Sequence, residues 1–280
     1  MGSGNNISDA DLSGPVVDRR TTMKLLGAAG MTSIAGCTGG GGDGGSDGND
    51  GGDGTTDAPS ADERGGRLTA GWFTGSIDVL DPPYISVGQY FQIAANVFNG
   101  LVTLKEDLTV RGDLAKDWQV ADGGRKFTFD LRKGVKFHNG TTFTADDVKY
   151  TIERTISEDA PAAPKLSTLE PVGEGGVVVK DDHTVELNFE QPMAPALIYL
   201  TRGPGRAATI VNKEAIEKQG KSSYKVKPVG TGPFEVTEHN VGSGLKLDAF
   251  DDYFGTDSEG NSLPYLDGID VEPIPEPATL

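Results

Sequence analysis

Few residues in this sequence have the types and spacing that catalysis or metal binding would require. The chain contains one cysteine, Cys37, and three histidines, His138, His183 and His239, which lie far apart and in or beside expected turns. Metal sites usually take His and Cys ligands from closely spaced motifs, and hydrolases place a nucleophile in a recognisable turn or beside a base. The sequence contains none of these patterns. We therefore expect no catalytic centre, no metal site and no cofactor, and we expect solvated turn positions for the three histidines.

Cys37 is the residue whose surroundings indicate a specific modification. It follows Ile34-Ala35-Gly36, an aliphatic residue and two small ones, in the arrangement of a lipobox, and the apolar run 25–35 overlaps this motif. Before the run stand Arg19 and Arg20, the twin arginines of a Tat-type export signal. The run is too short to cross a bilayer, which needs about 20 helical residues. We expect Cys37 to be lipidated; the alternative is an incidental or buried cysteine.

The segments around Cys37 are not expected to fold. Residues 1–36 are interpreted as a cleaved lipoprotein signal peptide, and residues 37–66, rich in Gly and Asp, as a flexible tether that cannot bury enough surface to offset its ordering entropy. The whole chain carries 25 Lys and Arg against 42 Asp and Glu, a formal charge of −17. That charge argues against binding nucleic acid or an anionic lipid surface, and it is typical of a protein kept soluble in concentrated salt.

The folded body is expected to begin with an α/β unit. The stretch 67–73 predicts a buried strand, and Pro82-Pro83 predicts an ordered loop after it. A helix should follow and stop at Asn99-Gly100. The apolar positions at helical spacing are Phe91, Ala94, Ala95 and Phe98.

The next block predicts an antiparallel sheet with a helix. A turn at 122–124 precedes a strictly alternating strand, and Thr144 with Asp147 forms a variant capping box at the start of a helix. Two further hairpins are expected, with turns at 181–182 and 242–244. The expected buried positions are Phe127, Phe129 and Leu131 in the strand, Val148, Ile152 and Ile156 in the helix, and Val185, Leu187 and Phe189 in the first hairpin.

Several sequence blocks resemble one known family. The long block "DLAKDWQVADGGRKFTFDLRKGVKFHNGTTFTADDVKYTIER" is similar to the signature region of the extracellular solute-binding proteins of family 5, the dipeptide-, oligopeptide- and nickel-binding components of ABC importers. The likeness continues in "AGWFTGSIDVLDPPY", "VFNGLV", "VGTGPFEV" and "LPYLDGIDVEPIPEPATL". It covers nearly all of residues 67–280 in the expected order.

The resemblance implies an α/β protein with the type II periplasmic-binding-protein-like fold, in which two lobes close on a ligand. It implies a first lobe formed by 67–100 and 230–280, an α/β subdomain inserted at 101–229, and a second lobe that is absent from this chain. The implied function is a monomeric binding protein, not an enzyme. It would capture peptides or a related solute such as a nickel chelate and deliver them to permease subunits powered by a separate ATPase. Lipid on Cys37 would hold it at the outer face of the cell membrane.

Two places are candidates for ligand contact. The loop Phe73, Thr74, Gly75 and Ser76 follows the first strand at its carboxyl end, where open α/β sheets place ligands; the alternative is an ordinary surface loop. Arg202 and Arg206 lie on a Gly/Pro-rich loop that resembles the region where nickel-binding members hold a metallophore carboxylate with an arginine. A guanidinium suits that bidentate task, although surface arginines are commoner than ligand arginines.

Other interpretations stay open at this point. The same scaffold could serve a tethered surface protein or a secreted hydrolase, or the chain could be a non-functional truncated fragment. The sequon Asn139-Gly140-Thr141 could be glycosylated outside the cell, although such short sequons also arise by chance.

Overall fold

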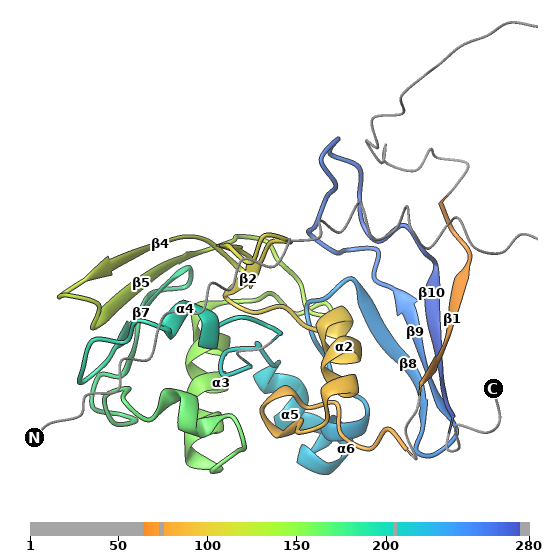
Figure 1. Ribbon diagram of the computed structural model, residues 1–280, viewed down its shortest axis with the longest axis horizontal. Helices are drawn as coiled ribbons and strands as arrows, with labels where there is room; N and C mark the ends of the chain where they lie inside the picture. The colour runs from red at the N-terminus through yellow and green to blue at the C-terminus, as the bar shows by residue number, and fades with distance from the viewer. Residues whose placement is uncertain (1–63, 73–75, 204–205, 275–280) are drawn as a thin grey trace, which may run out of the picture. The chain divides into compact units, whose positions relative to one another are not determined.

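The computed structural model describes residues 64–72, 76–203 and 206–274 (Figure 1). Within them the chain forms two four-stranded sheets, one two-stranded ribbon and several helices, so the expected mixed α/β class is confirmed. The expected signal peptide with Arg19 and Arg20, the lipidated Cys37 and the tether lie outside the described residues.

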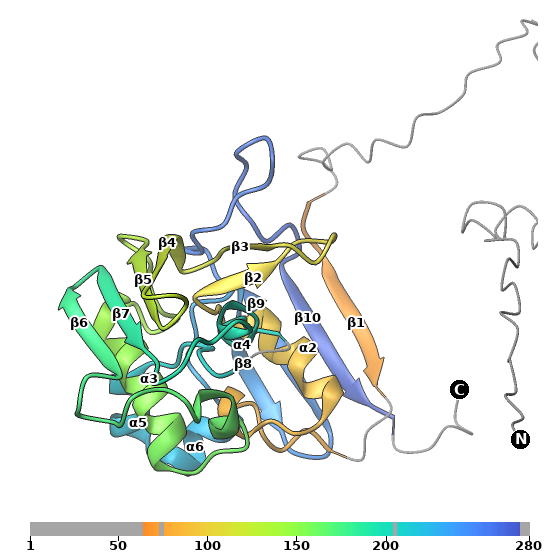
Figure 2. The same cartoon turned by 60° about the vertical axis from the view of Figure 1, so that its left-hand side comes forward.

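The first sheet joins the beginning of the described chain to its end. Its order is β1 (Arg67–Trp72), β10 (Gly268–Pro273), β9 (Gly244–Ala249) and β8 (Phe234–Asn240). β1 pairs parallel with β10, and the other pairs are antiparallel. Helix α2 (Gly88–Val97) packs against this sheet, as both views show (Figures 1 and 2). Their shared core includes Tyr90, Ile93, Val97, Phe234, Val236, Leu245, Leu247 and Val271.

The prediction of a buried first strand is correct for the strand and wrong for its burial. Every residue of β1 is exposed or half-buried, and Leu68 keeps 51% of its surface accessible. β1 is an edge strand among the described residues, because β10 is its one partner in the sheet. The apolar sequence of β1 therefore reports strand propensity here, and not a central position in the sheet.

Helix α2 buries a face that is shifted by one residue from the expected apolar positions and shares Ala94 with them. Its buried residues are Tyr90, Ile93, Ala94 and Val97, whereas Phe91 is half-buried. Phe98 is fully buried, as expected, but it follows the last helical residue in extended conformation. The apolar positions at 91 and 95 and those at 90 and 93 both fit a helical period, so spacing alone did not decide between two neighbouring faces.

The second sheet is built as the alternation predicts. Its order is β4 (Ala115–Ala121), β5 (Lys126–Leu131), β7 (Thr184–Asn188) and β6 (Val177–Asp181), all antiparallel. Helix α3 (Ala145–Ser157) shares a core with it. The expected buried residues Phe127, Phe129, Leu131, Val148, Ile152, Val185, Leu187 and Phe189 all lie in this core, and Ile156 packs against it.

The local signals at turns and helix ends are confirmed. The backbone N–H of Thr144 donates to the carboxylate of Asp147 at 3.0 Å, which forms the predicted capping box of α3. Asp122, Gly123 and Gly124 have φ of 49°, 64° and 91°, a left-handed turn that glycine accommodates without strain. The hairpins β6–β7 and β8–β9 turn where the sequence predicts.

The remaining elements lie along the chain between the strands and helices already described. They are η2 (Pro82–Tyr84), β2 (Val102–Leu104), β3 (Val110–Gly112), η3 (Ala163–Leu166), α4 (Ala196–Tyr199), α5 (Lys213–Gln219) and α6 (Lys221–Val226). Side chains from α5 and α6, including Ile216 and Tyr224, belong to the core of the first sheet. In the described part of the chain no helix is long and apolar enough to cross a membrane.

Candidate ligand-binding site

The loop expected to contact ligand is described at one residue. Phe73, Thr74 and Gly75 lie outside the described residues. Ser76 is half-buried, and its carbonyl oxygen accepts a hydrogen bond from the hydroxyl of Tyr90 on α2. The chain that leaves the carboxyl end of β1 is thus fastened to the helix that covers the first sheet.

Arg206 is held in an unusual conformation beside α2. Its φ is 66°, in the left-handed region that costs an L-residue roughly 1–2 kcal/mol. Nη1 donates to the carbonyl oxygen of Ile85 at 2.6 Å, and the guanidinium carbon lies 4.1 Å from the centroid of the Phe91 ring. Nε is buried and has no hydrogen-bond partner among the described residues. Strained backbone and an unsatisfied buried donor together are typical of a functional site.

A second cation lies close to Arg206. Lys165, in η3, is half-buried, and its pKa is lowered by burial and by the positive charge of Arg206. Burial also lowers the pKa of Arg206. The partly desolvated guanidinium of Arg206, which has no carboxylate partner among the described residues, is a place where a carboxylate would be stabilised. Sequence reasoning singled out Arg206 but missed Lys165 and Phe91, because their proximity depends on contacts between distant segments.

Arg202 does not join this cluster. Its neighbours are Arg111, Asp113 and Arg132, on the β2–β3 ribbon and at the end of β5. Its positive charge acts on the carboxylate of Asp113, which is 7% exposed. The two arginines that the sequence grouped on one loop therefore contact different parts of the fold.

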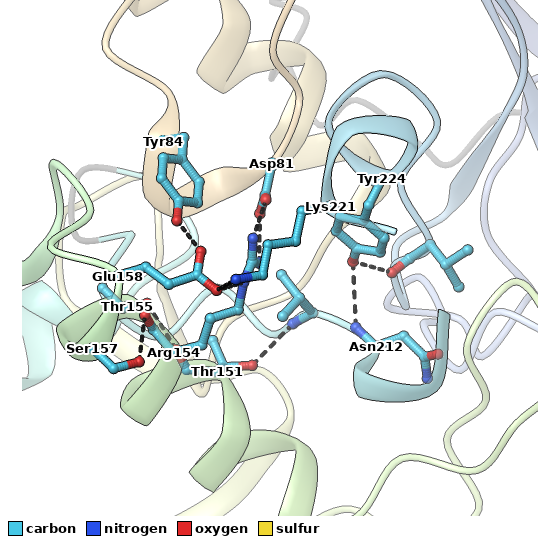
Figure 3. Close-up of polar contacts among 12 residues, drawn as sticks. Asp81, Tyr84, Thr151, Arg154, Thr155, Ser157, Glu158, Asn212, Lys221 and Tyr224 are labelled. Atoms are coloured by element: carbon cyan, nitrogen blue, oxygen red, sulfur yellow. Dashed lines mark hydrogen bonds and ion pairs between the residues drawn. The ribbon is translucent and has the colours of Figure 1, made fainter. Parts of the chain in front are cut away.

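A buried ion pair fixes the segment between β1 and α2. Asp81, the N-cap of η2, is fully buried, and its two carboxylate oxygens accept from Nη1 and Nη2 of Arg154 at 3.1 and 2.6 Å. Arg154 lies on α3, so the pair joins the loop after β1 to the helix of the second sheet (Figure 3). This bidentate geometry is the strongest form of an arginine–carboxylate contact.

Glu158 extends the pair into a network of charged side chains. It accepts from Nε of Arg154 at 3.2 Å, from Nζ of Lys221 at 2.8 Å and from the hydroxyl of Tyr84 (Figure 3). Burial opposes ionisation of Glu158, but the hydrogen bonds from Lys221 and Tyr84 lower its pKa. Arg154 and Lys221 thus face two carboxylates, and Lys225 adds a third cation, 4.3 Å from the centroid of the Tyr84 ring. These contacts link η2, α3 and α6.

Tyr224 and Thr151 complete the connections around this network. The hydroxyl of Tyr224 donates to the carbonyl oxygen of Val229 at 2.8 Å and accepts from the backbone N–H of Asn212 at 3.3 Å (Figure 3). The hydroxyl of Thr151 on α3 accepts from the backbone N–H of Val211 at 3.1 Å. The backbone groups of Val211, Asn212 and Val229 are therefore hydrogen-bonded to side chains from two helices, α3 and α6.

The expectation of solvated turn histidines is wrong for two of the three. His138 Nε2 lies 3.0 Å from the carbonyl oxygen of Gly232, and its Nδ1 accepts from the backbone N–H of Gly230 at 3.3 Å. Burial lowers the pKa of His138 to about 4. The ring nitrogens of His239 lie 2.5 and 2.6 Å from two backbone carbonyl oxygens. These rings tie segments together. His183 does lie in the β6–β7 turn, half-buried.

The structure also bears on possible metal ligands and on the sequon at Asn139. Among the described residues, no group of three His, Cys, Asp or Glu side chains could hold a metal ion. Asn139, the sequon residue, is half-buried, and its side-chain amide donates to the side chain of Asn212 at 3.2 Å.

Comparison with known proteins shows which family this chain resembles. The family model described as bacterial extracellular solute-binding proteins, family 5 Middle, matches residues 109–280. The glutathione-binding protein GsiB of Salmonella choleraesuis is 31% identical over 182 residues, which are 65% of this chain and 33% of that protein. The dipeptide-binding protein of Escherichia coli is 29% identical over 211 residues, which are 68% of this chain and 39% of that protein.

Solved structures agree with the sequence matches. The oligopeptide-binding protein AppA of Bacillus subtilis, solved in complex with a nonapeptide, is 28% identical and superposes with a TM-score of 0.65, covering 77% of this chain and 41% of that chain. This chain thus spans less than half the length of the relatives that it matches. Both sheets have the periplasmic-binding-protein architecture that the sequence resemblance implies, and the chain belongs to the extracellular solute-binding proteins of family 5.

Proposed function

We propose that this protein captures a peptide, or a related carboxylate-bearing solute such as a nickel chelate, outside the cell and delivers it to the permease of an ABC importer. The permease would be powered by a separate ATPase subunit. Support comes from the family match and from relatives whose names state that they bind glutathione and dipeptides. Both of those ligands carry free carboxylates.

The observation that carries the proposal is the fixed, partly buried guanidinium of Arg206, which has no carboxylate partner among the described residues. The guanidinium of Arg206 is fixed against Phe91 and Ile85, and its Nε is a buried donor without a partner in the described residues. A solute carboxylate would accept from that guanidinium and supply the counter-charge that it lacks among the described residues. Ser76 and the preceding loop at the carboxyl end of β1 would supply backbone groups to the solute, as in other extended-peptide sites.

The network around Asp81 and Arg154 has a supporting role in this proposal. It joins the loop after β1 to α3 through a buried ion pair. Binding sites need such rigid supports, because a guanidinium is effective when its position is fixed before the ligand arrives.

A solute titration tests the proposed function. Tryptophan fluorescence of the full chain reports on Trp72, the last residue of β1, which precedes the candidate loop, and on Trp118 in β4, so the titration is done in a Trp118→Phe background. Alanyl-alanine, trialanine, glutathione and a nickel–histidine chelate would be added to wild type and to Arg206→Gln. We expect saturable binding of at least one solute, weakened about tenfold or more in Arg206→Gln, since one charge-assisted hydrogen bond contributes about 1.5–3 kcal/mol.

The matched control for that titration is Arg125→Gln, because Arg125 is exposed and lies in the turn before β5. It should bind like the wild type. Absence of saturable binding across the panel would refute the transport function, and equal weakening by both substitutions would refute the role of Arg206.

The proposed domain division follows the two hydrophobic cores. We infer a first lobe from 67–100 and 230–280 and an inserted subdomain from 101 onward, as the sequence resemblance implies. Val211, Ala215 and Ile216 pack with the first sheet, which favours an inserted subdomain that ends near residue 210 instead of 229. Proteolysis that cuts near 210 and releases a stable fragment would support the earlier boundary.

The proposed location is the outer face of the membrane, through lipid on Cys37. The order of twin arginines, apolar run, small residues and cysteine supports it. Stable anchoring takes more than one acyl chain, so a diacyl-type modification is expected. Cys37→Ser should release the protein into the medium, whereas unchanged membrane retention would contradict the anchor.

A further inference from the structure

A pocket of about 170 Å³ opens at the end of the first sheet, away from the loop at Ser76. Part of its wall is the segment 253–263, which lies between the end of β9 and the start of β10. Because β1 and β10 run parallel, with Arg67 opposite Gly268, this segment lies at the end of the sheet where β1 begins. The candidate loop follows the other end of β1. The pocket is therefore separate from the proposed solute site.

Three arginines line this pocket. Arg111 comes from β3, Arg132 follows β5, and Arg202 follows α4. Arg132 is fixed, since its Nε donates to the main-chain oxygen of Asp113 at 2.7 Å and its guanidinium lies over the ring of Phe254 at 5.5 Å. Neither Arg111 nor Arg202 forms an ion pair with a carboxylate in the described part of the chain.

One carboxylate in the pocket does not balance three guanidinium groups. Asp113 accepts from the side-chain amide of Asn99 at 2.8 Å and from the backbone N–H of Gly100 at 3.0 Å, so its oxygens are already occupied. Burial raises the pKa of Asp113, and the nearby Arg202 opposes that shift. The pocket lining thus keeps an excess of positive charge in a chain whose formal net charge is −17.

We propose that this pocket binds a small multivalent oxyanion of the phosphate type, held by the guanidinium groups of Arg111 and Arg202 and placed by the fixed Arg132. Guanidinium groups match the geometry of phosphate and carboxylate oxygens, and several in one pocket favour an anion that carries more than one charge. The strongly acidic exterior repels an anionic bilayer surface, so a free anion is the expected occupant and a lipid headgroup is not.

Binding of inorganic phosphate to the full chain tests this site by isothermal titration calorimetry at low ionic strength. We expect one saturable site whose affinity falls as salt is added, because the contacts are ionic. Arg202→Gln and Arg111→Gln should each weaken binding about tenfold or more, in line with the loss of a charge-assisted hydrogen bond. Arg202→Lys, which keeps the charge and loses the planar fork, should give a smaller loss.

Two controls keep the result specific. Arg125→Gln removes an exposed arginine elsewhere, and Arg206→Gln removes the arginine of the proposed solute site; both should bind phosphate like the wild type. A thermal unfolding midpoint for each variant confirms that it is folded. Lack of saturable phosphate binding would overturn the proposal, and so would phosphate affinities of Arg111→Gln and Arg202→Gln equal to that of the wild type. Binding to phosphatidylglycerol vesicles without binding to free phosphate would also overturn it, in favour of a lipid headgroup.

Discussion

The clusters around Arg154 and Arg206 use the same functional group in opposite ways. The guanidinium of Arg154 is 3% exposed and meets two carboxylates, Asp81 and Glu158. The guanidinium of Arg206 meets an aromatic ring, one backbone carbonyl and the positive charge of Lys165. A buried charge whose partners are all supplied by the protein holds the fold together, whereas a partly buried charge without a counter-charge is suited to receive one from a ligand.

Removing a carboxylate from the cluster around Arg154 should have the largest effect on stability. Asp81→Asn leaves the buried guanidinium of Arg154 with half of its charge compensation. We expect the free energy of unfolding to fall by about 3 kcal/mol, at the low end of the range for a broken buried pair because Glu158 remains. Urea denaturation of the full chain followed by circular dichroism measures this change.

The double variant Asp81→Leu/Arg154→Met is the control for that measurement. It removes both charges and fills their space with apolar atoms, so it should be more stable than Asp81→Asn alone. If Asp81→Asn costs less than about 1 kcal/mol, the pair does not support the loop after β1 as described.

The dependence of stability on pH should reveal a third kind of group, a histidine whose effect differs from that of the two arginine clusters. His138 is half-buried without a charged partner among the described residues, and its pKa of about 4 lies below its ordinary value of 6.5. The unfolded chain therefore binds a proton that the folded chain does not, and stability present above pH 6.5 is lost as the pH falls towards 4. This shift corresponds to roughly 3 kcal/mol, at 1.36 kcal/mol for each unit of pKa.

His138→Gln isolates that contribution from the carboxylates that titrate in the same range. The difference in unfolding free energy between wild type and variant should shrink as the pH falls from 6.5 to 4. A constant difference across this range would mean that the ring of His138 takes up its proton in the folded chain at the same pH as in the unfolded chain.

Arg206→Gly should have the smallest effect on stability. Glycine accommodates the φ of 66° without strain, and this gain offsets the lost contact with Phe91, which contributes about 0.5–1 kcal/mol. The free energy of unfolding should change by less than about 1 kcal/mol, while solute binding should fall. A loss as large as that of Asp81→Asn would place Arg206 among the structural residues and would remove the contrast between the clusters.

The parts of the fold that sequence patterns predicted are those that local interactions determine. Alternation identified β5 and β7 with their buried faces, and the spacing of Thr144 and Asp147 identified the start of α3. The edge position of β1 was missed because its partner, β10, lies at the far end of the described chain. Pairing over such a distance leaves no mark on the local pattern of hydrophobic residues.

The candidate site was only partly predictable for the same reason. The loop containing Arg206 was identified from composition and resemblance, but no sequence signal reports that Arg202 and Arg206 contact different elements. Phe91 gave no such signal either, because its spacing placed it among the expected apolar positions of the helix, and its contact with Arg206 joins distant segments. The proximity of Lys165 and the pairing of Asp81 with Arg154 depend on tertiary packing.

The most direct test of solute binding at Arg206 is a four-way comparison of affinities. Trialanine and its C-terminal amide would be titrated against wild type and Arg206→Gln by tryptophan fluorescence. If the guanidinium holds the solute carboxylate, amidation should weaken binding to the wild type about tenfold or more and should have little further effect on Arg206→Gln. Equal losses on amidation in both proteins would contradict the assignment of Arg206 as the carboxylate-binding residue.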